Sequence, residues 1–385
     1  QRTEGGNETA LTADGLGINE KDFRYVSVET KMKLGTEEHA NQFSVPYLSD
    51  KSGKNAYTLL VEDSWDQYKS HVTDSSHKLN AGSVSLGQWQ DVRMDIDMVT
   101  DTFRVAIDGN YELVGDNARE KVDNLDQLKF YADSWNTGTI YIQSVDVTAQ
   151  KERKESADFY VSDNGDDEAD GQSPESAWKT IERVNQEHFI PGDQILFERG
   201  GVWEDQTLQP QGSGTADAKI HIGSYGSGEF PRISTNGKRA DGLYLCNQQY
   251  WEISELDISN TVEEFKFVTD GEIPTGNISE RESTEGEKLG DYRGIHVAGR
   301  DVTDLKGFYL HDLKVHDVTG HVAWIGDTGL SDSGIVNNGG LDGSKRTGGV
   351  LFECLSPTGK QPTQFSDVLI EKSEFINNSF CGITF

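Results

Sequence analysis

Four segments in the first 150 residues alternate apolar and polar residues with a period of two. Such alternation over short runs predicts half-buried antiparallel strands, because successive side chains of a strand point to opposite faces of its sheet. An Asp-Gly pair at 108–109 follows the third segment and is typical of a two-residue hairpin turn. Short strands joined by turns predict a β-sandwich over residues 21–150. The segments are Tyr25–Leu34, Trp89–Met98, Thr102–Ile107 and Gly138–Val147.

The stretches on either side of this domain are polar. Residues 1–20 are Gly-rich, and we expect a poorly ordered lead-in. Residues 151–156 form a charge run that reads as a solvated linker. A second domain is therefore expected over residues 157–385.

The second domain contains an internal repeat. The segments 251–260, 308–317 and 368–377 align without gaps, and a glycine-led apolar strand precedes each one, at Gly242, Gly294 and Gly349. Self-similarity in fixed register predicts a solenoid whose coils carry long insertions. The alignment places Asn260, Asp317 and Asn377 in one column, where side-chain amides and carboxylates satisfy a turn. The expected insertions are 261–291, 321–347 and 354–366.

The repeat starts again at Gly382-Ile-Thr-Phe385. Because a solenoid needs a cap over its last strands, we expect further coils beyond Phe385. On this expectation the β-helix seen here is incomplete at its C-terminal end, and part of an active site could lie outside it.

The string from Asp158 to Ile181, with its acidic glycine-rich loop and Trp-Lys-Thr-Ile ending, is followed by Pro191-Gly-Asp and a strand. This arrangement resembles the N-terminal cap and first coil of right-handed parallel β-helices of the pectate-lyase-like superfamily. The sandwich segments resemble the laminin-G or concanavalin-like jelly rolls attached to secreted enzymes that degrade polysaccharides. The resemblances imply an all-β chain, an extracellular location and a polysaccharide substrate.

The charge balance narrows the range of partners. The chain carries 35 Lys+Arg against 66 Asp+Glu, a net charge of −31. A surface this negative repels phosphate backbones and anionic membranes, so nucleic acid is not an expected partner. No apolar run approaches the roughly 18 residues that suggest a membrane span, so insertion into a membrane is not expected either.

Polar residues that could carry chemistry are densest around the repeat. His296 is expected to face outward, because its neighbours Ile295 and Val297 face inward. Glu353 follows the equivalent strand one coil away. Glycoside hydrolysis needs two carboxylates, and elimination next to a uronic acid needs a base with a cation. The candidate catalytic residues are Arg293, His296, His316, His321 and Glu353.

Each candidate also has a structural interpretation. His316 could be a satisfied inner histidine, Glu353 a surface carboxylate and Asp317 a turn residue. Aromatic and acidic residues near the insertions and in sandwich loops are candidates for sugar contact, although the sandwich tryptophans could instead plug its edge. The candidate substrate contacts are Tyr292, Trp324, Asp327, Trp65 and Trp135.

The loop Asp163–Asp170 places hard oxygen ligands at close spacing, which suits a structural calcium ion. A solvated acidic turn is the alternative. The candidate ligands are Asp163, Asp166, Asp167 and Asp170.

Three functions remain open from the sequence. An extracellular glycoside hydrolase is slightly favoured, because the acidic composition supplies carboxylates and the candidate groove has few Lys and Arg to hold a polyuronate. A polysaccharide lyase is close behind, since Arg293, Lys306, Lys345 and Arg346 could serve a polyuronate. A polysaccharide-binding adhesin without catalysis is the third.

Overall fold

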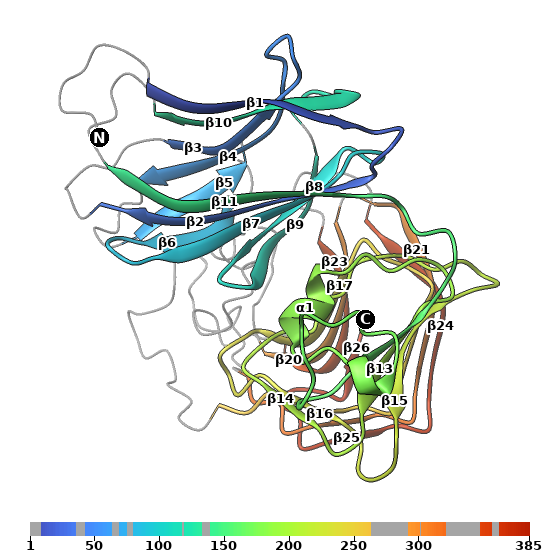
Figure 1. Cartoon of the computed structure of the whole chain (residues 1–385). Coiled ribbons are helices and arrows are strands. Elements are labelled where there is room, and N and C mark those ends of the chain that lie inside the picture. The colour runs from blue at the N-terminus through green and yellow to red at the C-terminus, as the bar shows by residue number, and fades with distance from the viewer. Residues whose placement is uncertain are drawn as a thin grey trace. The chain divides into compact units, whose positions relative to one another are not determined.

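The computed structural model divides into two compact units, Gln1–Glu152 and Arg153–Phe385, so the border lies within the segment 151–156 (Figure 1). It describes residues 9–35, 43–63, 69–74, 80–117, 119–132, 139–262, 292–300, 302–320, 347–355 and 362–385. Over these ranges, no helix is both long and apolar enough to cross a membrane.

The first unit consists of two antiparallel sheets that share one apolar core. The six-stranded sheet has the order β1-β10-β3-β4-β5-β6 and the five-stranded sheet the order β11-β2-β7-β8-β9. Val28, Met32 and Met94 are fully buried in that core. The strands are β1 (Thr9–Asn19), β2 (Tyr25–Leu34), β3 (Phe43–Ser49), β4 (Asn55–Asp63), β5 (Lys69–Asp74), β6 (Asn80–Ser85), β7 (Gln90–Asp97), β8 (Thr102–Ile107), β9 (Asn110–Asn117), β10 (Asn124–Ala132) and β11 (Ile140–Gln150).

The period-two segments correspond to strands of the five-stranded sheet. β2 and β8 have the predicted bounds, and β7 and β11 begin within two residues of the predicted starts. Asp108 and Gly109 connect β8 to β9 with φ of 47° and 77°. Positive φ at both central residues is the geometry of a type I′ hairpin turn, which the Asp-Gly pair predicts.

The expectation of a poorly ordered lead-in is wrong for residues 9–19. They form β1, which pairs antiparallel with β10 from Thr9 opposite Ala132 to Asn19 opposite Asn124. β1 is an edge strand with Leu11 61% exposed, and Ile18 is buried in the core. An edge strand that buries so little has no need of regular apolar alternation, which explains why its sequence reads as a loop.

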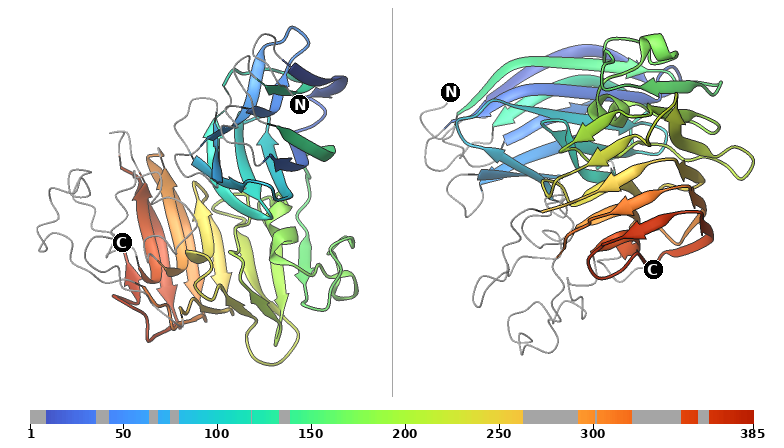
Figure 2. Two further views of the ribbon diagram at one scale, coloured as in Figure 1. Left: turned by 90° about the vertical axis from the view of Figure 1, so that its left-hand side faces the viewer. Right: turned by 90° about the horizontal axis from the view of Figure 1, so that it is seen from below.

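The second unit is a parallel β-helix whose strands stack coil upon coil along three sheets (Figure 2). The first sheet has the order β12-β13-β15-β18-β21-β24, the second β14-β16-β19-β22-β25 and the third β17-β20-β23-β26. The strands are β12 (Asp158–Val161), β13 (Gln194–Glu198), β14 (Val202–Glu204), β15 (Ile220–Tyr225), β16 (Arg232–Ser234), β17 (Asp241–Cys246), β18 (Trp251–Ser254), β19 (Asp257–Ser259), β20 (Arg293–Arg300), β21 (Asp304–His311), β22 (Lys314–His316), β23 (Gly348–Leu355), β24 (Gln364–Glu371), β25 (Glu374–Ile376) and β26 (Ile383–Thr384).

The gap-free repeat alignment is confirmed as the register of the coils. Trp251 pairs with Phe308 and Phe308 with Val368, while Ser259 pairs with His316 and His316 with Ile376. Apolar residues of the first two repeats point inward and are at most 2% exposed: Ile253, Leu256, Ile258, Leu313 and Val315. Ile370 and Phe375 of the last repeat pack against the same core and are partly buried.

The glycines that lead the repeated strands form a column. A Cβ added to Gly242 would lie 2.7 Å from the carbonyl oxygen of Gly294, and one added to Gly294 would lie 2.7 Å from that of Gly349. The same Cβ on Gly294 would lie 2.4 Å from Val315 Cγ1. Close stacking of the coils at this position therefore requires glycine in each of them.

The N-terminal cap is built around Trp178. Its indole donates a hydrogen bond to the carbonyl of Ala169 at 3.0 Å, and its ring stacks on Phe159 at 4.9 Å. A 3₁₀ turn, η1 (Pro174–Ser176), precedes it. The helix α1 (Ile181–Gln186) begins only after this tryptophan, because Trp178 bridges to Val161 and Thr180 serves as the N-cap.

The predicted ladder is only partly present. Asp317 and Asn377 both have a left-handed backbone, and the Asn377 amide donates to Asp317 Oδ1 at 2.5 Å. Asn260 lies in the same register but turns inward, where its amide donates to the carbonyl of Ala240 at 3.1 Å. The column therefore stacks at two of the three expected positions.

Candidate functional site

The two longest insertions enter the coil at one corner, between the second and third sheets. In two successive coils, residues 260–292 connect β19 to β20 and residues 317–347 connect β22 to β23. In the coil before them, residues 235–240 suffice for the same connection. Loops that differ this much on a regular scaffold are where function concentrates, so polar groups beside this corner are the first candidates.

The third sheet carries polar side chains on its outer face. Leu243, Leu245, Ile295 and Val297 belong to the core, and side chains alternate along a strand, so Tyr244 and His296 face away from it. Tyr244 pairs with His296 across the coils, and their rings stack at 4.8 Å. Both side chains are nevertheless buried.

A row of charged and polar side chains crosses three coils around this histidine. We call it the buried cluster; its members are Asp241, Tyr244, Arg293, His296 and Glu353. Arg293 donates through Nε to Asp241 Oδ1 and through Nη2 to Oδ2 at 3.3 Å. His296 Nδ1 lies 3.4 Å from Asp241 Oδ2, and Nε2 lies 3.0 Å from Glu353 Oε2.

The two contacts of the imidazole differ in kind. The contact with Asp241 has hydrogen-bond geometry. The contact with Glu353 has the distance of an ion pair, but Nε2 is a buried atom without a hydrogen bond of proper angle. The Glu353 side chain is 14% exposed, against 3% for the Asp241, Arg293 and His296 side chains. Glu353 is therefore the carboxylate of this cluster nearest to solvent.

Burial and charge act in opposite directions on Asp241. Burial alone would raise the pKa of this carboxyl, but the adjacent Arg293 guanidinium and His296 hold it below its ordinary value. Asp241 is thus an ionised anchor. For Tyr244, burial outweighs the opposing charge of Arg300 and raises the pKa of its hydroxyl well above the ordinary value, so it stays protonated.

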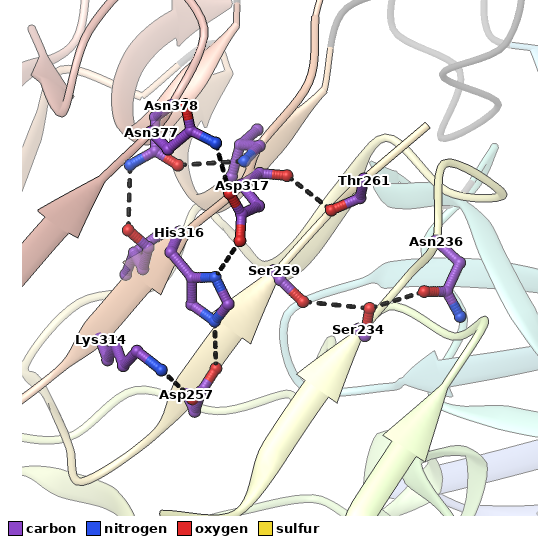
Figure 3. Close-up of polar contacts among 12 residues, drawn as sticks. Ser234, Asn236, Asp257, Ser259, Thr261, Lys314, His316, Asp317, Asn377 and Asn378 are labelled. Carbon is purple, nitrogen blue, oxygen red and sulfur yellow. Dashed lines mark hydrogen bonds and ion pairs between the residues drawn. The ribbon is translucent and has the colours of Figure 1, made fainter. Parts of the chain in front are cut away.

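A second group of charges lies on the second sheet, on the other side of the same corner (Figure 3). His316 Nδ1 is 2.6 Å from Asp317 Oδ2, and Nε2 is 2.7 Å from Asp257 Oδ1. Lys314 donates to the second oxygen of Asp257 at 3.0 Å. Hydrogen bonds from Asn377 and His316 lower the pKa of Asp317. His316 is therefore fixed between two carboxylates.

The same arrangement recurs on the first sheet. His311 Nδ1 is 2.7 Å from Asp312 Oδ2, and Nε2 is 3.1 Å from Glu252 Oε1 one coil away. Each histidine thus contacts the aspartate that follows it and a carboxylate of the preceding coil. Repetition on two different sheets of the coil points to a structural role in joining coils.

The structure brings together three of the five candidate catalytic residues, Arg293, His296 and Glu353. It places His316 apart from them, on the second sheet. Tyr292 is 3% exposed and packs in the apolar core, a position that argues against the expected contact with substrate. The remaining candidates, His321, Trp324, Asp327, Trp65 and Trp135, lie outside the described residues.

Sequence reasoning missed Asp241 and Tyr244. The signal was present, because Asp241-Gly-Leu-Tyr244 aligns with Arg293-Gly-Ile-His296 about the shared glycine. If the repeat alignment is extended to these positions, Asp241 falls beside Arg293 and Tyr244 beside His296. The register of β17 and β20 has the same pairs.

The acidic loop at the cap uses its carboxylates for backbone hydrogen bonds. Asp167 accepts from the backbone of Lys179 and Thr180 at 2.8 and 2.9 Å, and Asp170 accepts from Gln172 at 3.0 Å. Asp166 and Asp163 accept from Glu168 and Val202. Within the described part of the chain, no group of three or more His, Cys, Asp or Glu side chains could hold a metal ion. These carboxylates are engaged in backbone hydrogen bonds, and the calcium ion stays a prediction from sequence.

No family model matches this chain. It is 28% identical over 197 residues to the lacto-N-biosidase of Bifidobacterium longum subsp. longum, a match covering 43% of this chain and 12% of that protein. Two crystal structures of the GH136 lacto-N-biosidase from Eubacterium ramulus align with 58% and 59% of this chain, at 24% and 25% identity and a TM-score of 0.42. The alignments cover 34% and 36% of those chains, so this chain spans only part of the length of its relatives.

Proposed function

We propose that this chain is part of a glycoside hydrolase that acts on oligosaccharides. The 28% identity over 197 residues to a lacto-N-biosidase supports the reaction class. The buried cluster supports a site for it, because it links a solvent-reaching carboxylate to a buried, ionised one. Secretion and a carbohydrate partner are parts of the same proposal.

In this proposal Glu353 is the group that exchanges a proton with the glycosidic oxygen or with water. The single observation that carries this role is the contact of Glu353 Oε2 with His296 Nε2 at 3.0 Å, since His296 is in turn held by Asp241. A fixed ionised carboxylate orients the imidazole, and the imidazole orients Glu353. Asp241, Arg293 and His296 are positioning residues, because burial keeps them from touching a sugar.

The name of the relative suggests the substrate. A lacto-N-biosidase releases the disaccharide lacto-N-biose, and we propose an oligosaccharide that ends in this disaccharide. Hydrolysis of such a neutral sugar needs no cation to neutralise a uronic acid. This agrees with the pairing of Arg293 to Asp241, which leaves that guanidinium committed to the protein.

Two alternatives are separated by the product. A lyase acting on a uronic-acid polymer leaves an unsaturated sugar that absorbs ultraviolet light, and a non-catalytic adhesin binds without any product. Incubation of the chain with lacto-N-tetraose, followed by chromatography of the products, tests the proposal. Release of lacto-N-biose and lactose supports it. Turnover of a polyuronate with ultraviolet absorbance, or binding without turnover, contradicts it.

A further inference from the structure

The outer face of the five-stranded sandwich sheet exposes two aromatic rings around one lysine. Tyr141 of β11 pairs directly with Lys33 of β2, and Met32 pairs with Gln90 at the start of β7, which places Trp89 beside Lys33. The lysine Nζ lies 4.8 Å from the centre of the Tyr141 ring and 5.1 Å from that of Trp89. We call Trp89, Lys33 and Tyr141 the aromatic row.

The aromatic row belongs to the surface and not to the core. Met32 and Leu34, on either side of Lys33, are fully buried, so Lys33 points to the opposite face. Trp89 is 43% exposed and Tyr141 45% exposed. Exposed large aromatic rings that stand side by side cost solvation energy and are typical of a contact surface.

Lys33 differs from the other cations of this face. Lys31, one row away, makes an ion pair with Asp91 at 3.0 Å, Arg93 pairs with Glu29 at 3.1 Å, and Arg24 with Asp97 at 2.8 Å. Over the residues that the structure describes, Lys33 contacts the two rings and makes no ion pair. Its ammonium is thus available to an anion while the rings stay available to an apolar surface.

A sugar that carries an acidic group matches both features. The C–H face of a pyranose stacks on aromatic rings, and a carboxylate on the same sugar can accept hydrogen bonds from an ammonium between them. We propose that the aromatic row binds an acidic sugar residue of a glycan, at a site separate from the hydrolytic one. The site goes beyond the proposed hydrolysis, since it needs no turnover.

The overall charge of the chain makes the local ammonium decisive. A net charge of −31 repels an anionic ligand at long range. At about 0.15 M ionic strength the Debye length is about 8 Å, so distant charges are screened and the contact with Lys33 remains. Affinity measured at this ionic strength therefore reports the aromatic row and not the average surface.

The test compares matched acidic and neutral sugars by isothermal titration calorimetry on the full chain. The probes are tetragalacturonate with its fully methyl-esterified form, and sialyllactose with lactose. We expect at least one acidic probe to bind about tenfold more tightly than its neutral partner, a difference equal to about 1.4 kcal/mol. If neither acidic probe binds, or if each binds no better than its neutral partner, the proposal is wrong.

Variants tie the binding to these residues. Lys33→Gln, Trp89→Ala and Tyr141→Ala should each weaken binding of the acidic probe about tenfold or more, with the melting temperature nearly unchanged because the side chains are exposed. Lys129→Gln is the matched control, because Lys129 lies over one ring only, that of Tyr47 at 5.6 Å. This variant should bind the acidic probe like the parent. Unchanged affinity in Lys33→Gln would overturn the acidic part of the proposal.

Discussion

His296 links two carboxylates that come from the coil before it and the coil after it. Its Nδ1 lies 3.4 Å from Asp241 and its Nε2 lies 3.0 Å from Glu353. Asp241 pairs in register with Arg293, and the three side chains of Asp241, Arg293 and His296 are 3% exposed. One imidazole thus joins a buried ion pair to a carboxylate that reaches solvent.

The first prediction concerns the anchor of this chain of contacts. Asp241→Asn removes the charge that compensates the buried Arg293, and breaking a buried pair in this way costs about 3–5 kcal/mol. We expect the free energy of unfolding, measured in urea, to fall by that order. The double variant Asp241→Asn with Arg293→Met should recover part of the loss, because no unpaired guanidinium is left buried. A double variant no more stable than Asp241→Asn alone would contradict the role of Asp241 as the partner of the buried Arg293.

The second prediction concerns the glycine column. In Gly294→Ala the new Cβ would meet Val315 Cγ1 at 2.4 Å and the Gly349 carbonyl at 2.7 Å. Overpacking of this kind costs about 1–3 kcal/mol, so the midpoint of urea unfolding should fall. A thermal or urea midpoint equal to that of the parent would show that the coils do not stack this closely.

The third prediction concerns pH and the histidine on the first sheet. Burial alone would lower the pKa of His311, but hydrogen bonds with Asp312 and Glu252 outweigh it and raise the pKa above 6.5. A histidine whose pKa is raised on folding stabilises the fold fully below its unfolded pKa of about 6.5, and that stabilisation is lost as pH rises through the folded value.

The variant His311→Gln isolates this contribution. Unfolding free energies measured from pH 5 to pH 9 should fall less steeply for the variant than for the parent across the window above about 6.5. His221 faces the same Glu252, and burial together with the charge of His311 lowers the pKa of this second histidine. Its titration therefore runs in the opposite sense, and its pKa should rise in the variant. Identical pH profiles of the two proteins would show that His311 does not cause the loss of stability above about pH 6.5.

The sequence predicts the fold of this chain well because its signals are local. Alternation in Tyr25–Leu34 reports one buried face, and the repeat alignment reports which side chains stack. Both follow from the period of a strand and from the constancy of one coil. β1 is not predicted, because an edge strand with its outer face in solvent carries no such pattern.

The site is predicted only in part, because side-chain contacts depend on the turn of the backbone. The register places His296 and Glu353 on neighbouring coils, which the sequence does indicate. The alignment does not show that Asn260 turns inward while Asp317 and Asn377 stay outside, since the three share a column. The backbone conformation decides which way each side chain points, since Asp317 and Asn377 have positive φ.

The central claim is that Glu353 acts on substrate as an acid or base. A positioned acid or base is worth about 10²–10⁴ in rate, so Glu353→Gln should lower kcat by that factor. KM and the melting temperature should change little, because the glutamine keeps the shape of the side chain. Glu374→Gln is the matched control, since Glu374 is an exposed carboxylate on β25 of the second sheet and should leave kcat unchanged.

The most direct measurement is therefore kcat for release of lacto-N-biose from lacto-N-tetraose by the parent chain, Glu353→Gln and Glu374→Gln. The account predicts release by the parent and by Glu374→Gln, with a loss of at least about 100-fold in Glu353→Gln. Full turnover by Glu353→Gln would contradict the assignment of Glu353, and the absence of release by the parent chain would contradict the claim that the described coils carry the site.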